Sequence, residues 1–178
     1  ENTLETLHIA LNAAKERGTT LVVASSAGDT LIELIKMQEE LGTNVPMVMV
    51  GQAYGYPKQG VNTMTDERRA ELTAAGVHII HAAHALSGAE RGISRKFSGA
   101  YPVGIMAHTL RMFGQGTKVC VEIAMMALDN GAIEFNKPVV CVGGSARGAD
   151  TACIITPAYT ADCLDMKIHE ILCKPGLY

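Results

Sequence analysis

Two loops of small and hydroxyl-bearing residues carry the groups best suited to bind a phosphate. The first loop consists of Ser25, Ser26, Ala27, Gly28, Asp29 and Thr30. It offers three hydroxyl groups, a glycine that lets a ligand approach the backbone, and the free N–H groups of a helix that starts there. The loop therefore predicts an anion site. An ordinary turn, in which Asp29 caps the helix and the serines are solvated, is the alternative.

The second loop is richer in glycine than a turn requires. It consists of Gly143, Gly144, Ser145, Ala146, Arg147, Gly148, Ala149 and Asp150. Arg147 adds a forked donor that suits phosphate oxygens. The loop lacks the Gly-Lys-Ser/Thr of a P-loop, and Ser145 stands where a dinucleotide-binding fingerprint needs glycine. On its own, this loop is a weak signal for a nucleotide.

Three histidines follow one another at short spacing, at positions 78, 81 and 84. His78 and His81 fall on opposite faces of a predicted strand, because their separation is odd. We therefore expect no metal site and interpret these two as structural. His84 opens a polar segment, residues 84–99, and is a candidate for ligand contact.

Other charged residues have two interpretations each. Arg91, Arg95 and Lys96 lie in the polar segment and could close over an anion, or could be a solvated basic loop. Glu122 is the only acid inside an otherwise apolar helix, before Asp129 at its end, and Lys118 lies four residues earlier on the same face. A local ion pair is the expected role of these two residues.

Composition excludes several classes of protein. The chain has 178 residues, 48% of them hydrophobic, and a net charge of −3, which gives no basic surface for nucleic acid. Its apolar runs are the length of strands and too short to span a membrane. The five cysteines include no C-x-x-C pair, which favours reduced thiols. We expect one soluble, cytoplasmic domain over residues 1–178 that binds neither nucleic acid nor membrane.

The positions of apolar residues predict alternating strands and helices that would hold these loops. Strands are expected at residues 21–24, 46–50, 77–81 and 138–142. Further β-like segments at 151–156 and 166–172 are expected to form the edge of the same sheet. Helices are expected at residues 2–18, 29–41, 65–76, 102–113 and 118–130, while 84–99 is predicted to be a lid-like loop. This alternation is typical of a three-layer α/β/α fold with a mostly parallel sheet. The two loops follow the first and fourth strands, and would share a crevice if those strands are neighbours.

The helix that contains residues 119–128 is apolar on nearly all sides. A helix of this kind must be buried in its own chain or must face a partner. One face of a sheet would not cover all of its apolar surface, so we expect a homo-oligomer.

Four segments resemble a known family. Residues 21–30, Leu-Val-Val-Ala-Ser-Ser-Ala-Gly-Asp-Thr, and residues 139–151, Val-Val-Cys-Val-Gly-Gly-Ser-Ala-Arg-Gly-Ala-Asp-Thr, resemble the C-terminal α/β domain of pyruvate kinase. With residues 84–91 and 122–131, they are more similar still to the stand-alone proteins of that fold. The resemblance implies a five-stranded sheet of order 3-2-1-4-5 with one antiparallel edge strand, in which the first and fourth strands are neighbours.

The resemblance does not imply kinase activity. In pyruvate kinase the catalytic residues lie in a separate barrel, which needs about 250 residues. The same domain of that enzyme holds a sugar phosphate on a Thr-x-Ser-Gly-Arg-Ser loop, which Ser25, Gly28 and Thr30 match. Ala27 and Asp29 depart from it, and an acid in place of the arginine opposes a sugar bisphosphate unless it turns away.

The stand-alone relatives are associated with flavin mononucleotide (FMN), which is therefore the expected ligand. The resemblance implies that the phosphate lies on residues 25–30, and that residues 143–150 border the rest of the ligand together with His84, Leu86, Ser87 and Gly88. No residue has a clear catalytic role. A flavin-dependent oxidoreductase competes with a non-enzymatic regulatory module that binds a phosphorylated metabolite, and with an oligomeric scaffold whose loops are only turns.

Overall fold

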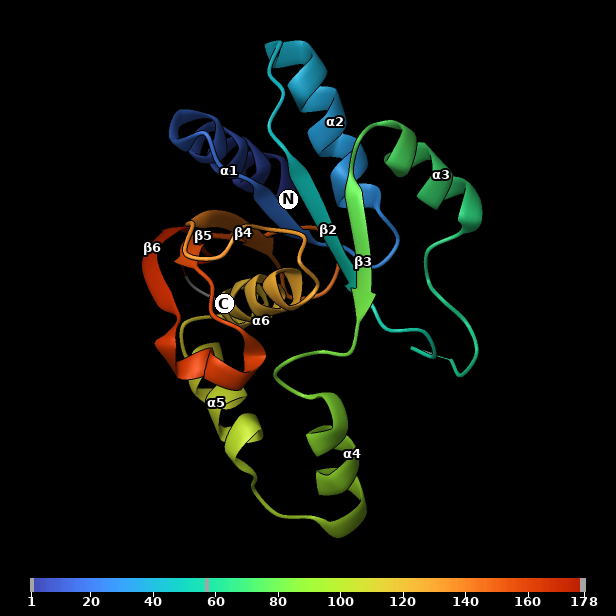
Figure 1. Ribbon diagram of the computed structural model, residues 1–178, viewed down its shortest axis with the longest axis vertical. Helices are drawn as coiled ribbons and strands as arrows, with labels where there is room; N and C mark the ends of the chain where they lie inside the picture. The colour runs from blue at the N-terminus through green and yellow to red at the C-terminus, as the bar shows by residue number, and fades with distance from the viewer. Residues whose placement is uncertain (1, 57, 177–178) are drawn as a thin grey trace.

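The computed structural model describes residues 2–56 and 58–176 and contains one mixed sheet flanked by helices (Figure 1). The strands are β1 (Leu21–Ala24), β2 (Met47–Gln52), β3 (His78–Ala82), β4 (Val139–Gly143), β5 (Thr151–Thr156) and β6 (Lys167–Cys173). The helices are α1 (Thr3–Arg17), α2 (Asp29–Leu41), α3 (Asp66–Ala74), α4 (Gly88–Phe97), α5 (Pro102–Arg111) and α6 (Gln115–Asp129), with a 3-10 helix at Thr160–Asp165.

The strand order in the sheet is β3-β2-β1-β4-β5-β6. β1 pairs in parallel with β2 on one side and with β4 on the other, so that Val22 lies between Val48 and Cys141. β5 is antiparallel to β4, and β6 is antiparallel to β5. The expected count of five strands is wrong, and the antiparallel strand is not at the edge. β6 takes that place, and its exposed Lys167 and Glu170 suit an edge strand.

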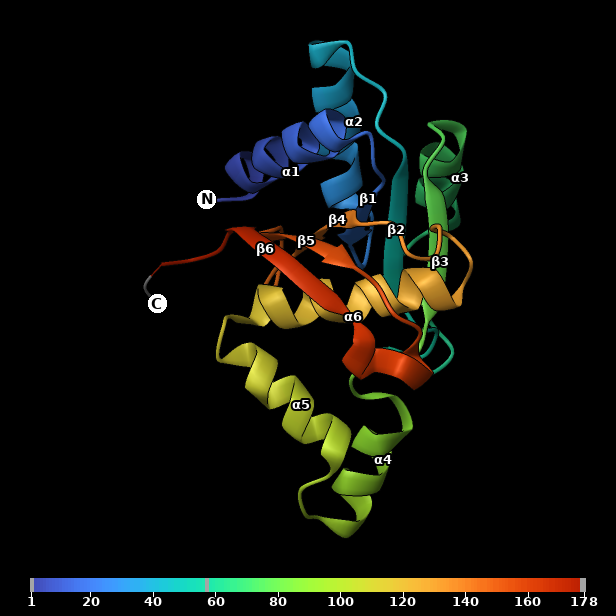
Figure 2. The same cartoon turned by 60° about the vertical axis from the view of Figure 1, so that its left-hand side comes forward.

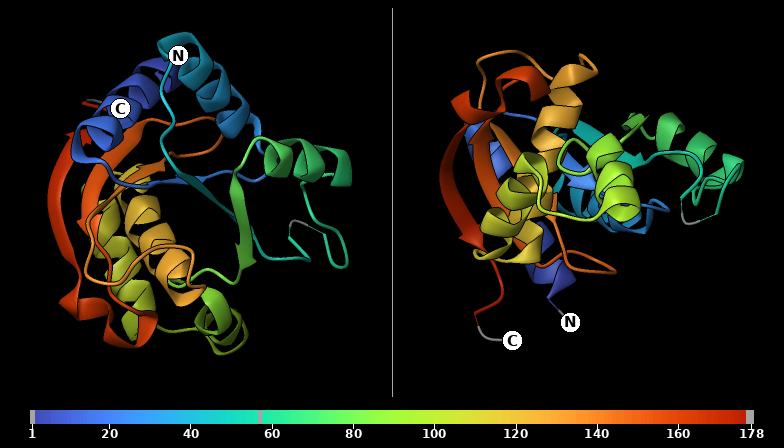
Figure 3. Two further views of the ribbon diagram at one scale, coloured as in Figure 1. Left: turned by 45° about the horizontal axis from the view of Figure 1, so that its top comes forward. Right: turned by 90° about the horizontal axis from the view of Figure 1, so that it is seen from below.

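Alternate residues of the strands enter two separate cores, one on each face of the sheet. Leu21 and Val23 of β1 pack in the core that α1, α2 and α3 cover, whereas Val22 packs in the core under α5 and α6. This alternation is the two-residue period of a strand that is buried on both faces. Helices thus cover both faces of the sheet, as Figures 2 and 3 show. The α/β class is as predicted.

Helix α6 is buried within its own chain. It packs against β1, β2, β4 and β5 on one side and against α5 on another, and its residues from Cys120 to Leu128 are almost inaccessible. The apolar surface that favoured a homo-oligomer is therefore covered by the sheet and α5 of the same chain. The homo-oligomer stays a prediction. No helix in the part of the chain that the structure describes is both long and apolar enough to cross a membrane.

The segment after β3 is not the loop that its polar composition indicated, because most of it is helix α4. α4 is amphipathic, with Ile93 and Phe97 still 45% and 69% exposed, and it lies with α5 beyond α6 (Figure 2). The Glu90 carboxylate accepts hydrogen bonds from the backbone N–H groups of Val103 and Gly104, at 3.2 and 2.6 Å. This contact caps the start of α5 and joins the two helices.

Two smaller expectations also differ at the helix ends. Asn2 precedes α1 but makes no side-chain capping bond, because its backbone is already helical. α6 begins at Gln115, three residues earlier than expected, because Gly114 with a φ of 115° ends the preceding turn and the helix starts directly after it. The longer helix places Lys118 in its second turn.

Thiol reactivity offers a test of this packing. Cys120, Cys141 and Cys153 are buried and free, and burial raises the pKa of Cys120 and Cys141 well above the ordinary thiol value. We expect only Cys163 and Cys173 to react with a water-soluble disulfide reagent in the native protein, because the thiolate is the reactive form. Peptide mapping after partial labelling measures this, and labelling of Cys141 before Cys163 would contradict it.

Candidate functional site

A single cleft brings together the three segments that the sequence singled out. It has a volume of about 1300 Å³ and opens at the carboxyl ends of β1, β2 and β4. The predicted residues that line it are Ser25, Ser26, Ala27, Asp29 and Thr30 from the first loop, Gly144, Ser145, Arg147 and Gly148 from the second, and His84, Ser87 and Gly88. Parallel neighbouring strands end at one edge of a sheet, which is why the two loops meet.

Some predicted site residues support the cleft and do not line it. Gly28 has a φ of 94°, and a Cβ there would lie 2.8 Å from Leu72 Cδ1 of α3, so only glycine fits. Gly143 packs against α6, where a Cβ would lie 2.7 Å from the Gly116 carbonyl oxygen. Leu86 is 2% exposed and belongs to the core.

The second loop, residues 143–150, is braced by its own last residues. The Asp150 carboxylate accepts hydrogen bonds from the Ser145 backbone N–H at 3.2 Å, from Ser145 Oγ at 2.8 Å and from Thr151 Oγ1 at 2.6 Å. The Ala149 N–H donates to Thr3 Oγ1 at 3.2 Å and ties the loop to α1. Asp150 and Ala149 thus shape the loop, and the Arg147 side chain stays 94% exposed at its tip.

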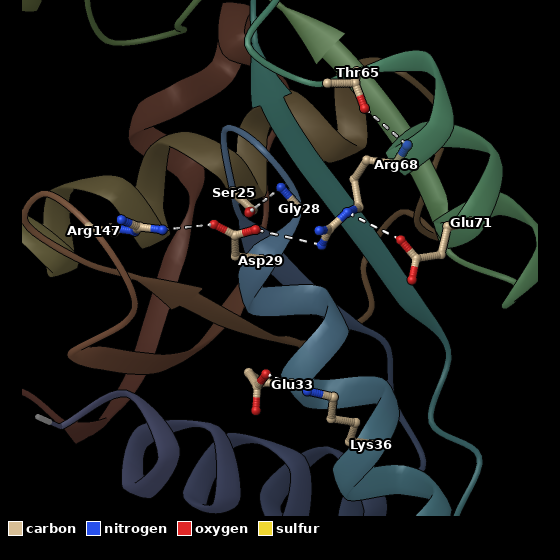
Figure 4. Close-up of polar contacts among 9 residues, drawn as sticks. All are labelled: Ser25, Gly28, Asp29, Glu33, Lys36, Thr65, Arg68, Glu71 and Arg147. Carbon is tan, nitrogen blue, oxygen red and sulfur yellow. Dashed lines mark hydrogen bonds and ion pairs between the residues drawn. The ribbon is translucent and has the colours of Figure 1, made fainter.

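The first loop, residues 25–30, forms the N-terminus of α2. Ser25 Oγ accepts a hydrogen bond from the Gly28 N–H at 3.0 Å, which closes the turn (Figure 4). The amides of Leu31 and Ile32 both donate to the Gly28 carbonyl and are the first to bond inside the helix. The backbone N–H groups before these two have no acceptor within the helix. The positive end of the helix dipole therefore faces the cleft.

Asp29 does not cap α2, although the interpretation of the first loop as an ordinary turn expected it to. The N-cap position belongs to Gly28, and the Asp29 carboxylate turns sideways between two arginines (Figure 4). Asp29 Oδ1 lies 3.5 Å from Arg68 Nη1, and Oδ2 lies 3.5 Å from Arg147 Nη2. These exposed pairs are each worth about 1 kcal/mol at most. The two arginines therefore offset the negative charge of Asp29, which opposed a phosphate at this loop. Because these contacts are weak, a phosphate dianion could bind the same arginines.

A buried charged cluster lines another part of the cleft. Lys118 Nζ lies 2.5 Å from Glu122 Oε2, and the two side chains are 3% and 4% exposed. The other oxygen of Glu122 accepts a hydrogen bond from the Leu86 N–H at 2.9 Å. His84 Nδ1 lies 3.8 Å from Glu122 Oε2. The predicted ion pair is present and buried, and the partly exposed His84 lies beside it.

Burial shifts the protonation of this cluster. Desolvation lowers the pKa of Lys118, and the nearby charges of Arg111 and Arg91 add to that effect, while Glu122 opposes it. Desolvation also lowers the pKa of His84, again against the carboxylate of Glu122. Both groups therefore give up their protons more readily than they would in water.

The cleft carries an excess of positive charge. Five basic side chains line it against three carboxylates: Arg68, Arg91, Arg111, Lys118 and Arg147 against Asp29, Glu33 and Glu122. Sequence reasoning missed Arg68 and Arg111 as cleft residues, because each lies in an ordinary solvated helix pattern. A charged pair inside an otherwise apolar helix was the one available signal for Lys118.

Of the other two histidines in this run, His81 makes structural contacts. His81 Nδ1 lies 2.9 Å from the Gln52 carbonyl oxygen and 3.3 Å from Asn62 Nδ2, which joins β3 to the loop after β2. His78 is exposed at the start of β3. Within residues 2–56 and 58–176, no group of three or more His, Cys, Asp or Glu side chains is arranged to hold a metal ion.

Comparison with known protein families assigns none to this chain, because no family model matches it. Fold class alone does not determine activity, since the same α/β architectures carry many unrelated functions. The function therefore has to be argued from the cleft and from the groups that line it.

A pair of helical glycines tests how tightly α6 holds the second loop. A Cβ at Gly116 would overlap Thr151 Oγ1 and lie 2.5 Å from Asp150 Oδ1, whereas a Cβ at Gly92 in α4 meets nothing within 4 Å. We expect Gly116→Ala to lower the free energy of unfolding by about 1–3 kcal/mol, as overpacking does. Gly92→Ala should raise it by about 0.5–1 kcal/mol. Urea unfolding measures both, and equal effects would contradict this packing.

The protonation of His84 gives a second test. We expect its midpoint in an NMR titration to lie below the ordinary value of 6.5, because burial disfavours the imidazolium. A pKa that is lower in the folded state means that stability from this group is present above pH 6.5 and falls as the pH drops below it. His84→Asn should weaken that part of the pH dependence of urea unfolding. A midpoint above 6.5 would contradict the assignment.

Proposed function

We propose that this protein binds FMN in the cleft between the two small-residue loops. The observation that carries the proposal is that five residues of the loop 25–30, all but Gly28, and residues 144–148 line one cleft at the ends of neighbouring parallel strands. The resemblance of residues 21–30 and 139–151 to stand-alone relatives of the pyruvate kinase C-terminal domain suggests FMN among phosphate-bearing ligands.

The phosphate would bind at the N-terminus of α2. The hydroxyl groups of Ser25, Ser26 and Thr30 line the cleft beside the backbone amides of that helix start. Arg147 and Arg68 lie near the same helix start, because each makes a weak contact with Asp29. A helix N-terminus with hydroxyls and guanidinium groups beside it is a typical phosphate site.

The remaining volume suits the flat ring of a flavin. The cleft, at about 1300 Å³, exceeds the roughly 300–1000 Å³ usual for small-ligand pockets. Apolar walls come from Val50, Val119, Ile123 and Met126, and Tyr56 adds an aromatic side chain. FMN, when bound, supplies hydride and electron transfer, while the protein supplies position and electrostatics.

Titration of the purified protein with FMN tests the proposal. We expect quenching of flavin fluorescence with a dissociation constant in the micromolar range. Arg147→Glu should weaken binding by about tenfold, equivalent to about 1.4 kcal/mol, because it places an acid beside the phosphate. Lys137→Glu is the matched control, since it makes the same charge change at a side chain that is 66% exposed and does not line the cleft.

The outcomes separate the candidate functions. No quenching at micromolar FMN would overturn the flavin proposal, and equal weakening by both variants would overturn the phosphate position. If FMN fails to bind but inorganic phosphate raises the melting temperature of the wild type and not of Arg147→Glu, the cleft binds a different phosphorylated metabolite. That result would favour the regulatory module.

A further inference from the structure

Lys118 has the properties of a reactive amine. An ion pair with Glu122 alone would not require it to be buried in the cleft. Its side chain is only 3% exposed, yet Lys118 is one of the residues that line the cleft. Ordinary lysines keep the amine in water, where it is protonated and unreactive. A lysine becomes nucleophilic when it is desolvated or lies near other cations.

The charged groups near Lys118 come from separate parts of the chain. Glu122 lies on the same helix, His84 follows β3, Arg91 belongs to α4 and Arg111 belongs to α5. Burial disfavours the ammonium and lowers the pKa of Lys118, Glu122 opposes this shift, and the charges of the two arginines add to it. Glu122 is also fixed in place, because the Leu86 N–H holds its other oxygen.

We infer that Lys118 forms a covalent imine with the carbonyl carbon of a small phosphorylated aldehyde or ketone bound in the cleft. Lys118, its proton acceptor Glu122 and the two small-residue loops line the same cleft. This goes beyond flavin binding, because the bond needs no flavin. The phosphate on the ligand does rest on the function proposed above, since it uses the same loop of residues 25–30.

The step balances with the groups present. Glu122, 2.5 Å from the ammonium, takes one proton and leaves a neutral amine. The amine nitrogen attacks the carbonyl carbon, a C–N bond forms, and the carbonyl oxygen takes a proton from that nitrogen. Glu122 then returns its proton to the hydroxyl group, which leaves as water, and the product is a protonated imine. One water is released, and no oxidant or reductant takes part.

The excess of cations explains the choice of a phosphorylated ligand. The guanidinium groups of Arg91 and Arg111 line the cleft around Lys118, and Arg147 lies at its rim. A neutral carbonyl compound would leave this excess of positive charge in place, whereas a phosphate bound on residues 25–30 lowers it and holds the carbonyl at a fixed position relative to the amine. Holding the carbonyl at the amine in this way is the main contribution of binding to such a step.

Trapping with borohydride tests the inference. The probe is pyridoxal 5′-phosphate, which has an aldehyde and a phosphate, and pyridoxal is the matched probe without phosphate. After reduction and peptide mapping, we expect Lys118 to be labelled about tenfold faster than Lys137, whose side chain is 66% exposed. Pyridoxal should label Lys118 much more slowly. Absence of the Lys118 adduct, or equal labelling of the two lysines, would overturn the inference.

Two variants separate chemistry from packing. Lys118→Arg keeps the positive charge opposite Glu122 but has no nucleophilic amine, so its reduced peptide should carry no adduct at position 118. Glu122→Gln keeps the shape and removes the proton acceptor, so labelling of Lys118 should slow by about tenfold or more. Circular dichroism checks that both fold. Unchanged labelling in folded Glu122→Gln would overturn the proton transfer described above.

FMN used as a competitor distinguishes the two proposals. If FMN binds and protects Lys118 from the probe, both proposals hold and share the cleft. If FMN does not bind but the probe labels Lys118, the flavin proposal fails and the imine inference stands. If FMN binds while Lys118 of the FMN-free protein is not labelled, the inference fails alone.

Discussion

The parallel pairing of β1 with β4 is the constraint on which the rest of the site depends. Leu21 lies opposite Val140 and Val23 opposite Val142, so the two strands end at the same edge. Their following loops are separated by more than a hundred residues in the sequence, yet line one cleft. The pairing is fixed by burial, because a slip by one residue would move Val22 out of one core and into the other.

The cleft combines two kinds of charge pair with different physical consequences. Asp29 meets its arginines at 3.5 Å near solvent, where such pairs contribute little and rearrange easily. Lys118 and Glu122 meet in a buried setting, where loss of one partner would leave an uncompensated charge. The first pair therefore suits reversible anion binding, and the second suits a fixed position and a perturbed proton affinity. Helix α6 supplies the second pair and also covers the sheet, so packing and chemistry share one element.

Local patterns predicted the elements better than their relationships. The β-like segment at residues 166–172 was recognised and expected at the edge of the sheet, whereas the five-stranded count that the resemblance implied left it out. The polar segment after β3 contains α4, which is held by the Glu90 contact to the start of α5. No local sequence pattern predicts that contact. Arg68 and Arg111 were missed as cleft residues for the same reason, since their surroundings come from distant parts of the chain.

The sequence by itself determined the α/β class, because strand and helix patterns alternate along the chain. It also determined the two glycine- and serine-containing loops and the Lys118–Glu122 pair, because each of these follows from spacing within a few residues. Only the tertiary structure decided that Asp29 turns away from the helix start, that the pair is buried, and that His84 lies beside it. These outcomes depend on which elements pack against each group. Desolvation and long-range charge contacts arise from that packing, and residue spacing carries no record of them.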